Sequence, residues 1–121
     1  MEQQKSLREA ILAPRALKRE TVHVPEWDVD VVVQELTAAE RDAFEASCLT
    51  RKGKKMEPNT ANLRAKLIVQ TLRKEDGTRI FGDGDVDEVG KLSAAAVNRL
   101  FEVASRLSGL TEEDVEELEK N

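Results

Sequence analysis

The sequence predicts a small, mostly helical α+β domain with an N-terminal β-hairpin and a minor second hairpin. Three observations support this fold class. The chain has 121 residues, which is enough for one compact hydrophobic core. Hydrophobic residues make up 40% of it and aromatic residues only 3%, so the core must be mainly aliphatic, which favours helix packing over a β-sandwich. One early segment alternates apolar and polar residues, whereas later segments repeat at helical spacing.

The first predicted helix begins at Ser6. Ser6 and Glu9 have the spacing of a capping box, in which each side chain bonds a backbone amide at the start of a helix. Leu7 and Ile11 share one face of this helix. Pro14 is expected to end it, because proline lacks an amide donor and clashes with the preceding turn.

Residues 21–34 are predicted to form the N-terminal β-hairpin. Valines alternate with polar side chains on both halves of this segment. Pro25 and Glu26 mark the point where the chain reverses, because proline cannot donate to a central ladder. Trp27 is expected at the tip or flank of the hairpin, and His23 on its solvent-facing side.

The next segment is predicted to be a helix that ends near Leu49. Thr37 and Glu40 form a second capping box, and alanines with Phe44 follow at helical spacing. Residues 51–58 (RKGKKMEP) have no apolar period, so we interpret them as an exposed loop. Their basic side chains could contact nucleic acid or an acidic partner, but no aromatic residue is interleaved for base stacking. A solvated loop is the favoured interpretation.

The most apolar helix is expected after this loop, at the centre of the fold. Asn59 or Thr60 can cap its start. Its main stripe consists of Ala61, Ala65, Ile68 and Leu72. The Asp-Gly pair at residues 76–77 tolerates the positive backbone angles of a tight turn, which predicts the minor second hairpin over residues 74–81.

Two more helices are expected in the following segment. Asp85 and Glu88 cap a short helix, which Gly90 is expected to end in the left-handed conformation. Residues 94–108 then form the best amphipathic helix of the chain, ended by Gly109. Its inward face consists of Val97, Leu100, Phe101, Ala104 and Leu107.

The C-terminal segment differs from the rest in charge. Thr111 and Asp114 repeat the capping spacing and predict a final helix over residues 112–120. Residues 111–121 hold six acidic side chains and one lysine, so they carry the whole net charge of −5. We therefore divide the chain into an α+β domain, residues 1–110, and an acidic C-terminal helix that either packs on the body or binds a partner. Its thin apolar stripe, the candidate partner-binding site, consists of Leu110, Val115 and Leu118.

The composition argues against an enzyme, a metalloprotein and a cofactor-binding protein. His23 is the only histidine and Cys48 the only cysteine, so no triad or zinc site that needs a second histidine or several cysteines can form. The acidic run from Asp83 to Glu88 resembles a calcium loop. However, Glu88 stands at its sixth position and Ala94 at its twelfth, where that loop requires glycine and glutamate. No catalytic residue, metal ligand or cofactor is predicted.

The same composition indicates where the protein works. The apolar runs are far shorter than the roughly 20 residues that span a bilayer, so no membrane segment is expected. The N-terminus lacks the order of a signal peptide, and the lone Cys48 fits a reducing compartment. Outside the acidic C-terminal segment the charges balance, which disfavours a general nucleic-acid binder. We expect a cytoplasmic binding protein without enzymatic activity.

Two stretches carry a resemblance to a known family. They are TVHVPEWDVDVVVQELTAAERDAFEAS, residues 21–47, and NLRAKLIVQTLRKEDGTRIFGDGDVDEVGKLSAAAVNRLFEVASRLSGLTEED, residues 62–114. In this order they resemble the tail assembly chaperones of long-tailed bacteriophages and prophages. The resemblance implies a protein of the host bacterial cytoplasm that binds the tape measure protein, keeps it soluble, helps recruit tail tube subunits and is absent from the mature virion.

Two rival functions stay open at this point. One is a structural tail or head-tail connector protein that remains in the virion, and the other is a small nucleic-acid-binding regulator. The oligomeric state, including a homo-oligomer, is also open.

The family resemblance implies a ribosomal frameshift as well, because tail assembly chaperones of this kind are commonly made in two lengths. Glu119-Lys120-Asn121 can be encoded GAA AAA AAC, which contains the heptamer A AAA AAC. On such a heptamer both tRNAs can re-pair after slipping back one nucleotide. Because Lys-Asn is also an ordinary dipeptide, the codons of the gene decide this prediction.

Overall fold

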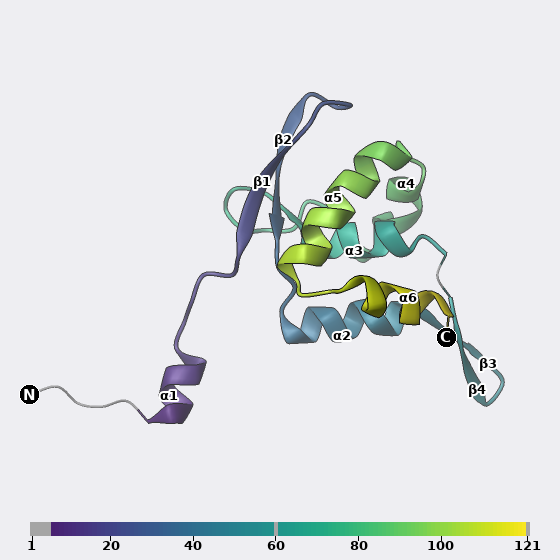
Figure 1. The fold of residues 1–121 in the computed structure, drawn as a ribbon, viewed down its shortest axis with the longest axis horizontal. Helices are drawn as coiled ribbons and strands as arrows, with labels where there is room; N and C mark the ends of the chain where they lie inside the picture. Colours follow the sequence, from purple (N-terminus) through teal and green to yellow (C-terminus); the bar gives the residue numbers. More distant parts are fainter. Residues whose placement is uncertain (1–5, 60, 121) are drawn as a thin grey trace, which may run out of the picture.

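The computed structural model describes residues 6–59 and 61–120, and it confirms the predicted α+β class. These residues form six α-helices, a three-stranded antiparallel sheet and a separate two-stranded hairpin (Figure 1). No helix among them is long and apolar enough to cross a membrane.

The first helix, α1 (Leu7–Leu12), begins where the sequence predicts. The Ser6 hydroxyl accepts a hydrogen bond from the Glu9 amide at 3.2 Å. The helix stands away from the body (Figure 1) and buries none of its residues. Leu7 is 82% exposed and Ile11 72% exposed, so its apolar face has no cover within the described chain.

Strands β1 (Arg19–Val24) and β2 (Val29–Gln34) form the predicted N-terminal hairpin. The chain reverses directly after Val24, where the Trp27 amide donates to the Val24 carbonyl at 3.1 Å. Trp27 packs partly against the core, as expected for the hairpin tip. The short strand β5 (Leu72–Arg73) pairs with the other edge of β2, so the strand order is β1-β2-β5.

The second regular hairpin does not lie where the sequence predicts. The basic segment interpreted as a loop is a hairpin of β3 (Leu49–Lys52) and β4 (Lys55–Pro58), and Gly53 supplies the positive φ of +63° for its tight turn. The loop interpretation was therefore wrong.

The segment 74–81 forms a turn instead of a hairpin with two strands. The Lys74 amide donates to the Thr78 carbonyl at 2.8 Å, and Gly77 has a φ of +91°. Only one bridge, between Arg73 and Arg79, pairs the two sides of this turn within the described residues. The Ile80 amide also donates to the Leu72 carbonyl at 3.3 Å, and the Arg79 guanidinium donates to the Val69 carbonyl at 2.8 Å.

Helices α2 (Ala38–Ser47) and α3 (Leu63–Thr71) lie in the predicted order. Both hydrogen bonds of the Thr37–Glu40 capping box are present at the start of α2. The capping prediction for α3 was wrong for Asn59, and Thr60 lies outside the described residues. Asn62 occupies the N-cap with a φ of +57°, and the Asn59 side chain accepts from the Ala61 amide instead.

The role predicted for Gly90 was also wrong. A 3₁₀ turn (Asp83–Asp85) leads into the short helix α4 (Val86–Gly90), and Gly90 belongs to this helix without a left-handed φ. A Cβ atom on Gly90 would lie 2.6 Å from Oδ1 of Asn62. A side chain at position 90 would therefore have to displace the Asn62 amide, so the glycine fits the close approach of Asn62 and does not end the helix.

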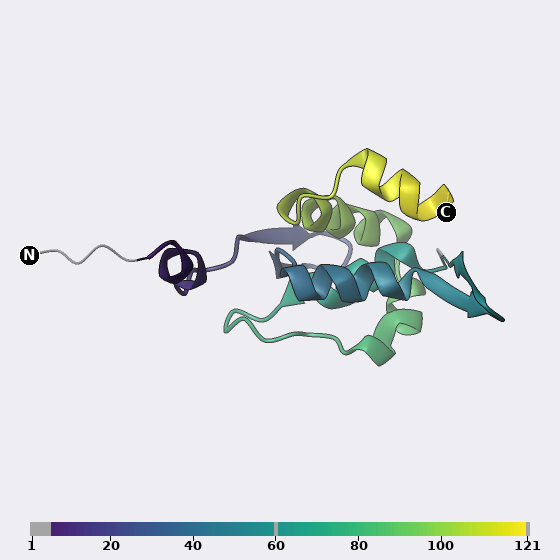
Figure 2. The same ribbon diagram turned by 90° about the horizontal axis from the view of Figure 1, so that it is seen from below.

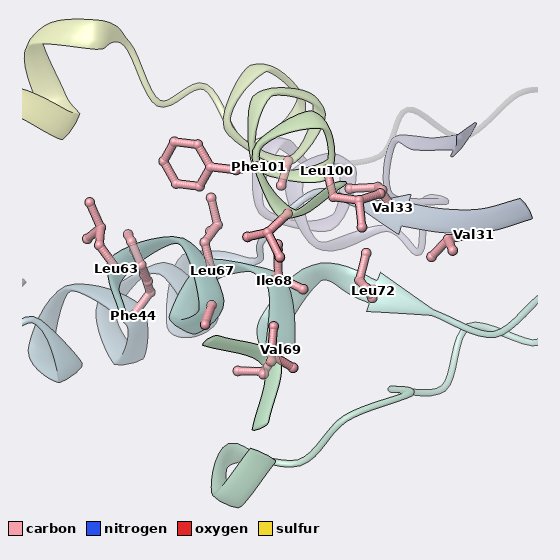
Figure 3. Packing of buried hydrophobic residues seen from close by; sticks show 14 of the residues in the cluster. Val31, Val33, Phe44, Leu63, Leu67, Ile68, Val69, Leu72, Leu100 and Phe101 are labelled. Atoms are coloured by element: carbon pink, nitrogen blue, oxygen red, sulfur yellow. The ribbon is translucent and has the colours of Figure 1, made fainter. Parts of the chain in front are cut away.

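The core lies between α3, α5 (Ala94–Leu107) and the sheet. Leu67 and Ile68 of α3 point toward Leu100 of α5 (Figure 3), and each of the three is at most 1% exposed. The predicted inward face of α5 is thus confirmed at its centre. Gly109 ends α5 with a φ of +71°, as predicted.

The chain folds back after α5 through a Schellman motif. The Leu110 amide donates to the Ser105 carbonyl at 2.9 Å and the Gly109 amide donates to the Arg106 carbonyl at 3.3 Å. Helix α6 (Glu112–Lys120) follows and forms an outer layer over α5 (Figure 2). Thr111 and Asp114 make the two reciprocal hydrogen bonds of the predicted capping box.

Candidate partner-binding site

The three residues predicted to bind a partner lie between α6 and the body of the protein. Leu110 is buried and belongs to the hydrophobic core. Val115 and Leu118 are half-buried and pack against that core from α6. The apolar stripe of α6 therefore faces inward.

Two grooves are lined jointly by α6 and the body. The α5–α6 groove has a volume of about 430 Å³, and its apolar lining includes Phe101 and Val115. The α2–α6 groove has a volume of about 220 Å³, and its lining includes Cys48, Leu49 and Leu118. Leu110 lines both grooves. Because each half-buried residue of α6 lies beside open space, α6 is packed less tightly than α3 or α5.

The ion pair that joins α6 to α2 adds little to this packing. Arg41 of α2 lies 3.8 Å from the Asp114 carboxylate, and both side chains are more than one third exposed. Such exposed ion pairs contribute little to stability. Hydrogen bonds from the backbone and side chain of Thr111 lower the pKa of Asp114, so this carboxylate stays charged at neutral pH.

The β3–β4 hairpin supplies a basic surface next to α6. All eight residues of its two strands are exposed, and it projects from the body (Figure 1). The hairpin has four basic residues and one acidic residue, Glu57, whose carboxylate lies 3.4 Å from the Lys52 ammonium group. The C-terminal part of α6 ends near the base of the hairpin, and α6 contacts β4. An acidic helix and a basic hairpin thus lie next to each other. The four basic residues are Arg51, Lys52, Lys54 and Lys55.

The residues considered for catalysis and metal binding have local structural roles. His23 is exposed, with Nδ1 2.8 Å from Oδ1 of Asp30. Cys48 is buried, which raises the pKa of its thiol. Asp83 accepts from Arg79 at 2.8 Å, and Asp85 accepts from the Gly82 amide at 2.8 Å. Across residues 6–59 and 61–120, no cluster of three or more histidine, cysteine or acidic side chains could hold a metal ion.

Sequence reasoning missed one ion pair in the interior. Arg73 of β5 donates to a carboxylate oxygen of Glu40 at 2.6 Å and to the Gln70 carbonyl at 2.9 Å. Burial raises the pKa of Glu40, but hydrogen bonds from the Thr37 backbone and from Arg73, together with the charge of Arg73, outweigh burial and leave the pKa lowered. The pair joins α2 to β5 across 33 residues of sequence, a separation that no local pattern reveals.

Other residues that line the grooves were also missed as candidates, among them Phe101, Leu49 and Arg41. Phe101 was assigned to the core, and the other two lie on separate elements. Their proximity to α6 depends on how α6 folds back.

The sequence matches the family model for phage tail assembly chaperones over residues 6–121. The chain belongs to this family. The fold of the chaperone is similar to the structure of the bacteriophage HK97 tail assembly chaperone, with a TM-score of 0.61 and 20% sequence identity, covering 88% of this chain and 96% of that one. A search of curated proteins gave no match. The family resemblance predicted from the sequence is therefore confirmed.

Proposed function

We propose that this chaperone binds the tape measure protein of a long-tailed phage, keeps its apolar helices soluble and helps recruit tail tube subunits during assembly. Family membership supports the chaperone role. The observation that supports the proposed contact with the partner is the packing of α6. Its half-buried residues Val115 and Leu118 each line a groove on the surface.

Grooves of this kind suit a helical partner. An amphipathic helix that lies in an apolar groove is a common mode of protein recognition. Leu110 forms part of the wall of both grooves, while Val115 and Leu118 can contact the partner from α6. The three residues therefore remain the proposed contact for the tape measure protein.

Co-expression with the tape measure protein tests this function. The tape measure protein is expected in the soluble fraction with the wild-type chaperone and mainly in the pellet with Leu118→Asp. Glu113→Asp serves as the matched control, because Glu113 is exposed on the same helix. The proposal fails if the tape measure protein stays insoluble with the wild type, or if Leu118→Asp solubilises it equally well.

The proposed site of action is the host cytoplasm, and the chaperone leaves before the particle is complete. Mass spectrometry of purified virions distinguishes this from a structural tail or head-tail connector protein. Peptides of the chaperone are expected in infected-cell lysate and not in virions. Their recovery from virions in amounts matching the tail tube protein would favour the connector function.

The proposed function includes a longer, frameshifted form. Glu119 belongs to α6, whereas Asn121 lies outside the described residues. Sequencing the gene tests this form: codons AAA and AAC for Lys120 and Asn121, with an open frame one nucleotide back, are expected. The lack of that overlapping frame would contradict it.

A further inference from the structure

We infer that strand β1 pairs with β1 of a second copy of this chain. The two strands run antiparallel about a two-fold axis at Thr21, so that the sheets of the two copies become continuous. This inference goes beyond the proposed function and does not depend on it. No residue of β1 lines the two grooves beside α6, so both copies keep the proposed contact with the tape measure protein.

The first step concerns the outer edge of the sheet. Strand β1 is the end of the order β1-β2-β5, so only one of its edges is paired within the described chain (Figure 1). The Glu35 amide donates to the Lys18 carbonyl, and bonded and non-bonded residue pairs alternate along an antiparallel ladder. The backbone N–H and C=O groups of Arg19, Thr21 and His23 therefore point away from β2. None of these groups has a hydrogen bond among residues 6–59 and 61–120.

The second step is that this edge is regular enough to accept another strand. Six residue pairs join β1 to β2 in one-to-one register without a bulge, and no proline interrupts β1. Natural sheets usually protect an exposed edge with bulges, prolines or inward-pointing charges. The inward-facing charge of β1 is Glu20, and Arg106 donates to both of its carboxylate oxygens at 2.9 Å. A free edge of this form binds an added strand through backbone hydrogen bonds.

The third step concerns the occupant, because the sequence of β1 is complementary to itself in one register. With Thr21 on the two-fold axis, Thr21 lies opposite Thr21 of the second copy, and Arg19 lies opposite His23. These pairs place the outward-facing backbone groups against each other, so each pair exchanges two hydrogen bonds. Glu20 then lies opposite Val22 of the second copy, and its carboxylate meets no like charge across the new ladder.

Registers shifted by two residues fit less well. One shift places Glu20 opposite Glu20 of the second copy, and like charges directly opposite each other destabilise a sheet. The other shift places Arg19 opposite Pro25, which has no amide to donate. In the register centred on Thr21, Arg19 instead shares the outer face of the joined sheet with an acid, because Asp30 lies 2.8 Å from His23. This self-complementarity is what a two-fold interface between identical chains requires.

The fourth step concerns α1, whose apolar side chains are 62–82% exposed, namely Leu7, Ile11 and Leu12. Six residues, 13–18, separate α1 from β1, and such a stretch spans at most about 20 Å. In the antiparallel arrangement the start of each β1 lies beside the end of the other, so α1 reaches the hairpin tip of the second copy. Val29 is 44% exposed at that tip, and Trp27 is only half-buried. The tip thus offers apolar surface to a helix that its own chain leaves uncovered.

Sedimentation equilibrium of the full-length chain tests the inference. The wild type is expected to pass from monomer toward dimer between about 10 µM and about 1 mM, because a small interface binds weakly. Thr21→Pro removes the amide that faces the free edge and leaves the bonds to β2, so the dissociation constant of its dimer should rise at least about tenfold. Thr21→Val keeps that amide and should dimerise like the wild type.

A charge exchange at the same position tests the register without a proline. Thr21→Glu and Thr21→Lys each place like charges across the two-fold axis, so each should dimerise about fivefold more weakly than Thr21→Gln. An equimolar mixture of the two charged variants should dimerise within about twofold of Thr21→Gln, because opposite charges then meet. Thr21 is exposed, so the variants should keep the cooperative melt of the wild type at the lowest concentration.

Three results would each overturn the inference. They are a wild type that stays monomeric at the highest concentration, a Thr21→Pro variant that dimerises as well as the wild type, and a mixture that dimerises no better than either charged variant alone. A monomeric wild type would leave the β1 edge to a strand of another protein.

A chain that starts at Ala16 tests the contact of α1 separately. This chain keeps Lys18 and all of β1, so its melt at low concentration should match that of the full-length chain. Its dimer should be about fivefold weaker, because the apolar contact of α1 is lost. Equal dimerisation of the two chains would overturn the contact between α1 and the second copy.

Discussion

A Cβ atom on Gly90 would meet the side-chain amide of Asn62, which would have to move. Asn62 also donates to the Asp87 carboxylate at 3.3 Å, so the amide group is held against α4. We predict that Gly90→Ala lowers the free energy of unfolding by about 1 kcal/mol, because the added methyl group displaces this amide. Urea denaturation of the two proteins measures the difference.

The control for this substitution is the same change, Gly90→Ala, made in an Asn62→Gly variant. Glycine accepts the φ of +57° at this position and removes the side chain that Gly90 approaches. In that background Gly90→Ala should stabilise the protein by about 0.5–1 kcal/mol, since alanine is the better helix former. The prediction is wrong if the substitution destabilises both backgrounds equally.

Glu40 makes the stability of the chaperone depend on acid. Its pKa is lowered in the folded protein, so the Glu40–Arg73 pair stabilises fully above the ordinary glutamate pKa of 4.5, and this contribution is lost as the pH falls through the lowered value. We predict that Glu40→Gln costs about 1 kcal/mol at pH 7 and clearly less at pH 3. Urea denaturation at both values measures the cost, and an equal cost at both would contradict the assignment.

Leu100 is the residue whose replacement should be least tolerated. It is fully buried between α5 and α3 (Figure 3). Leu100→Asp should unfold the protein, because an unpaired buried carboxylate costs several kcal/mol against a total stability of about 5–15 kcal/mol. Circular dichroism follows the loss of the cooperative melt. Glu102→Ala, on the exposed side of the same helix, should melt like the wild type.

At the scale of elements, side-chain caps predicted the starts of α1, α2, α5 and α6, whereas the caps of α3 and α4 and the second hairpin were predicted less well. Side chains that bond the nearest backbone amides define the starts of α2 and α6, and this information lies within four residues. The β3–β4 hairpin was missed because its strands carry no alternating apolar face, and all eight of their residues are exposed. Gly53 was the available turn signal in that segment.

Helix α6 is the element whose removal should leave the rest folded. A chain that ends at Leu110 keeps the Schellman motif and the buried leucine, and it loses the two half-buried residues Val115 and Leu118. We predict a cooperative melt with a stability lower by about 1–3 kcal/mol. Calorimetry measures this. Aggregation or loss of the cooperative transition would show that Val115 and Leu118 are part of the indispensable core.

For the whole molecule, the sequence predicts which elements form and leaves open how distant ones meet. The apolar stripes of α3 and α5 predicted the centre of the core, because burial follows from helical periodicity. The Glu40–Arg73 pair and the grooves beside α6 depend on contacts between elements far apart in sequence, which no periodic pattern encodes. That Leu110, Val115 and Leu118 share one apolar stripe could be predicted, whereas the surface that they face could not.

The extent of the cooperative unit follows from the same contacts. The sequence predicted a domain over residues 1–110 with a first helix from Ser6, but α1 buries none of its residues, and a six-residue helix without tertiary contacts is marginal in water. The first long-range hydrogen bonds join Lys18 to Glu35, where the Lys18 amide donates to the Glu35 carboxylate at 2.6 Å and the Glu35 amide donates to the Lys18 carbonyl at 2.9 Å.

A chain that starts at Ala16 should therefore unfold with a free energy within about 0.5 kcal/mol of the full-length chain. A chain that starts at Thr21 loses this pair and two of the six residue pairs of the β1–β2 register, and its melting temperature should fall by several degrees. If both truncations melt alike, or if the first is already destabilised, the folded unit does not begin at Lys18.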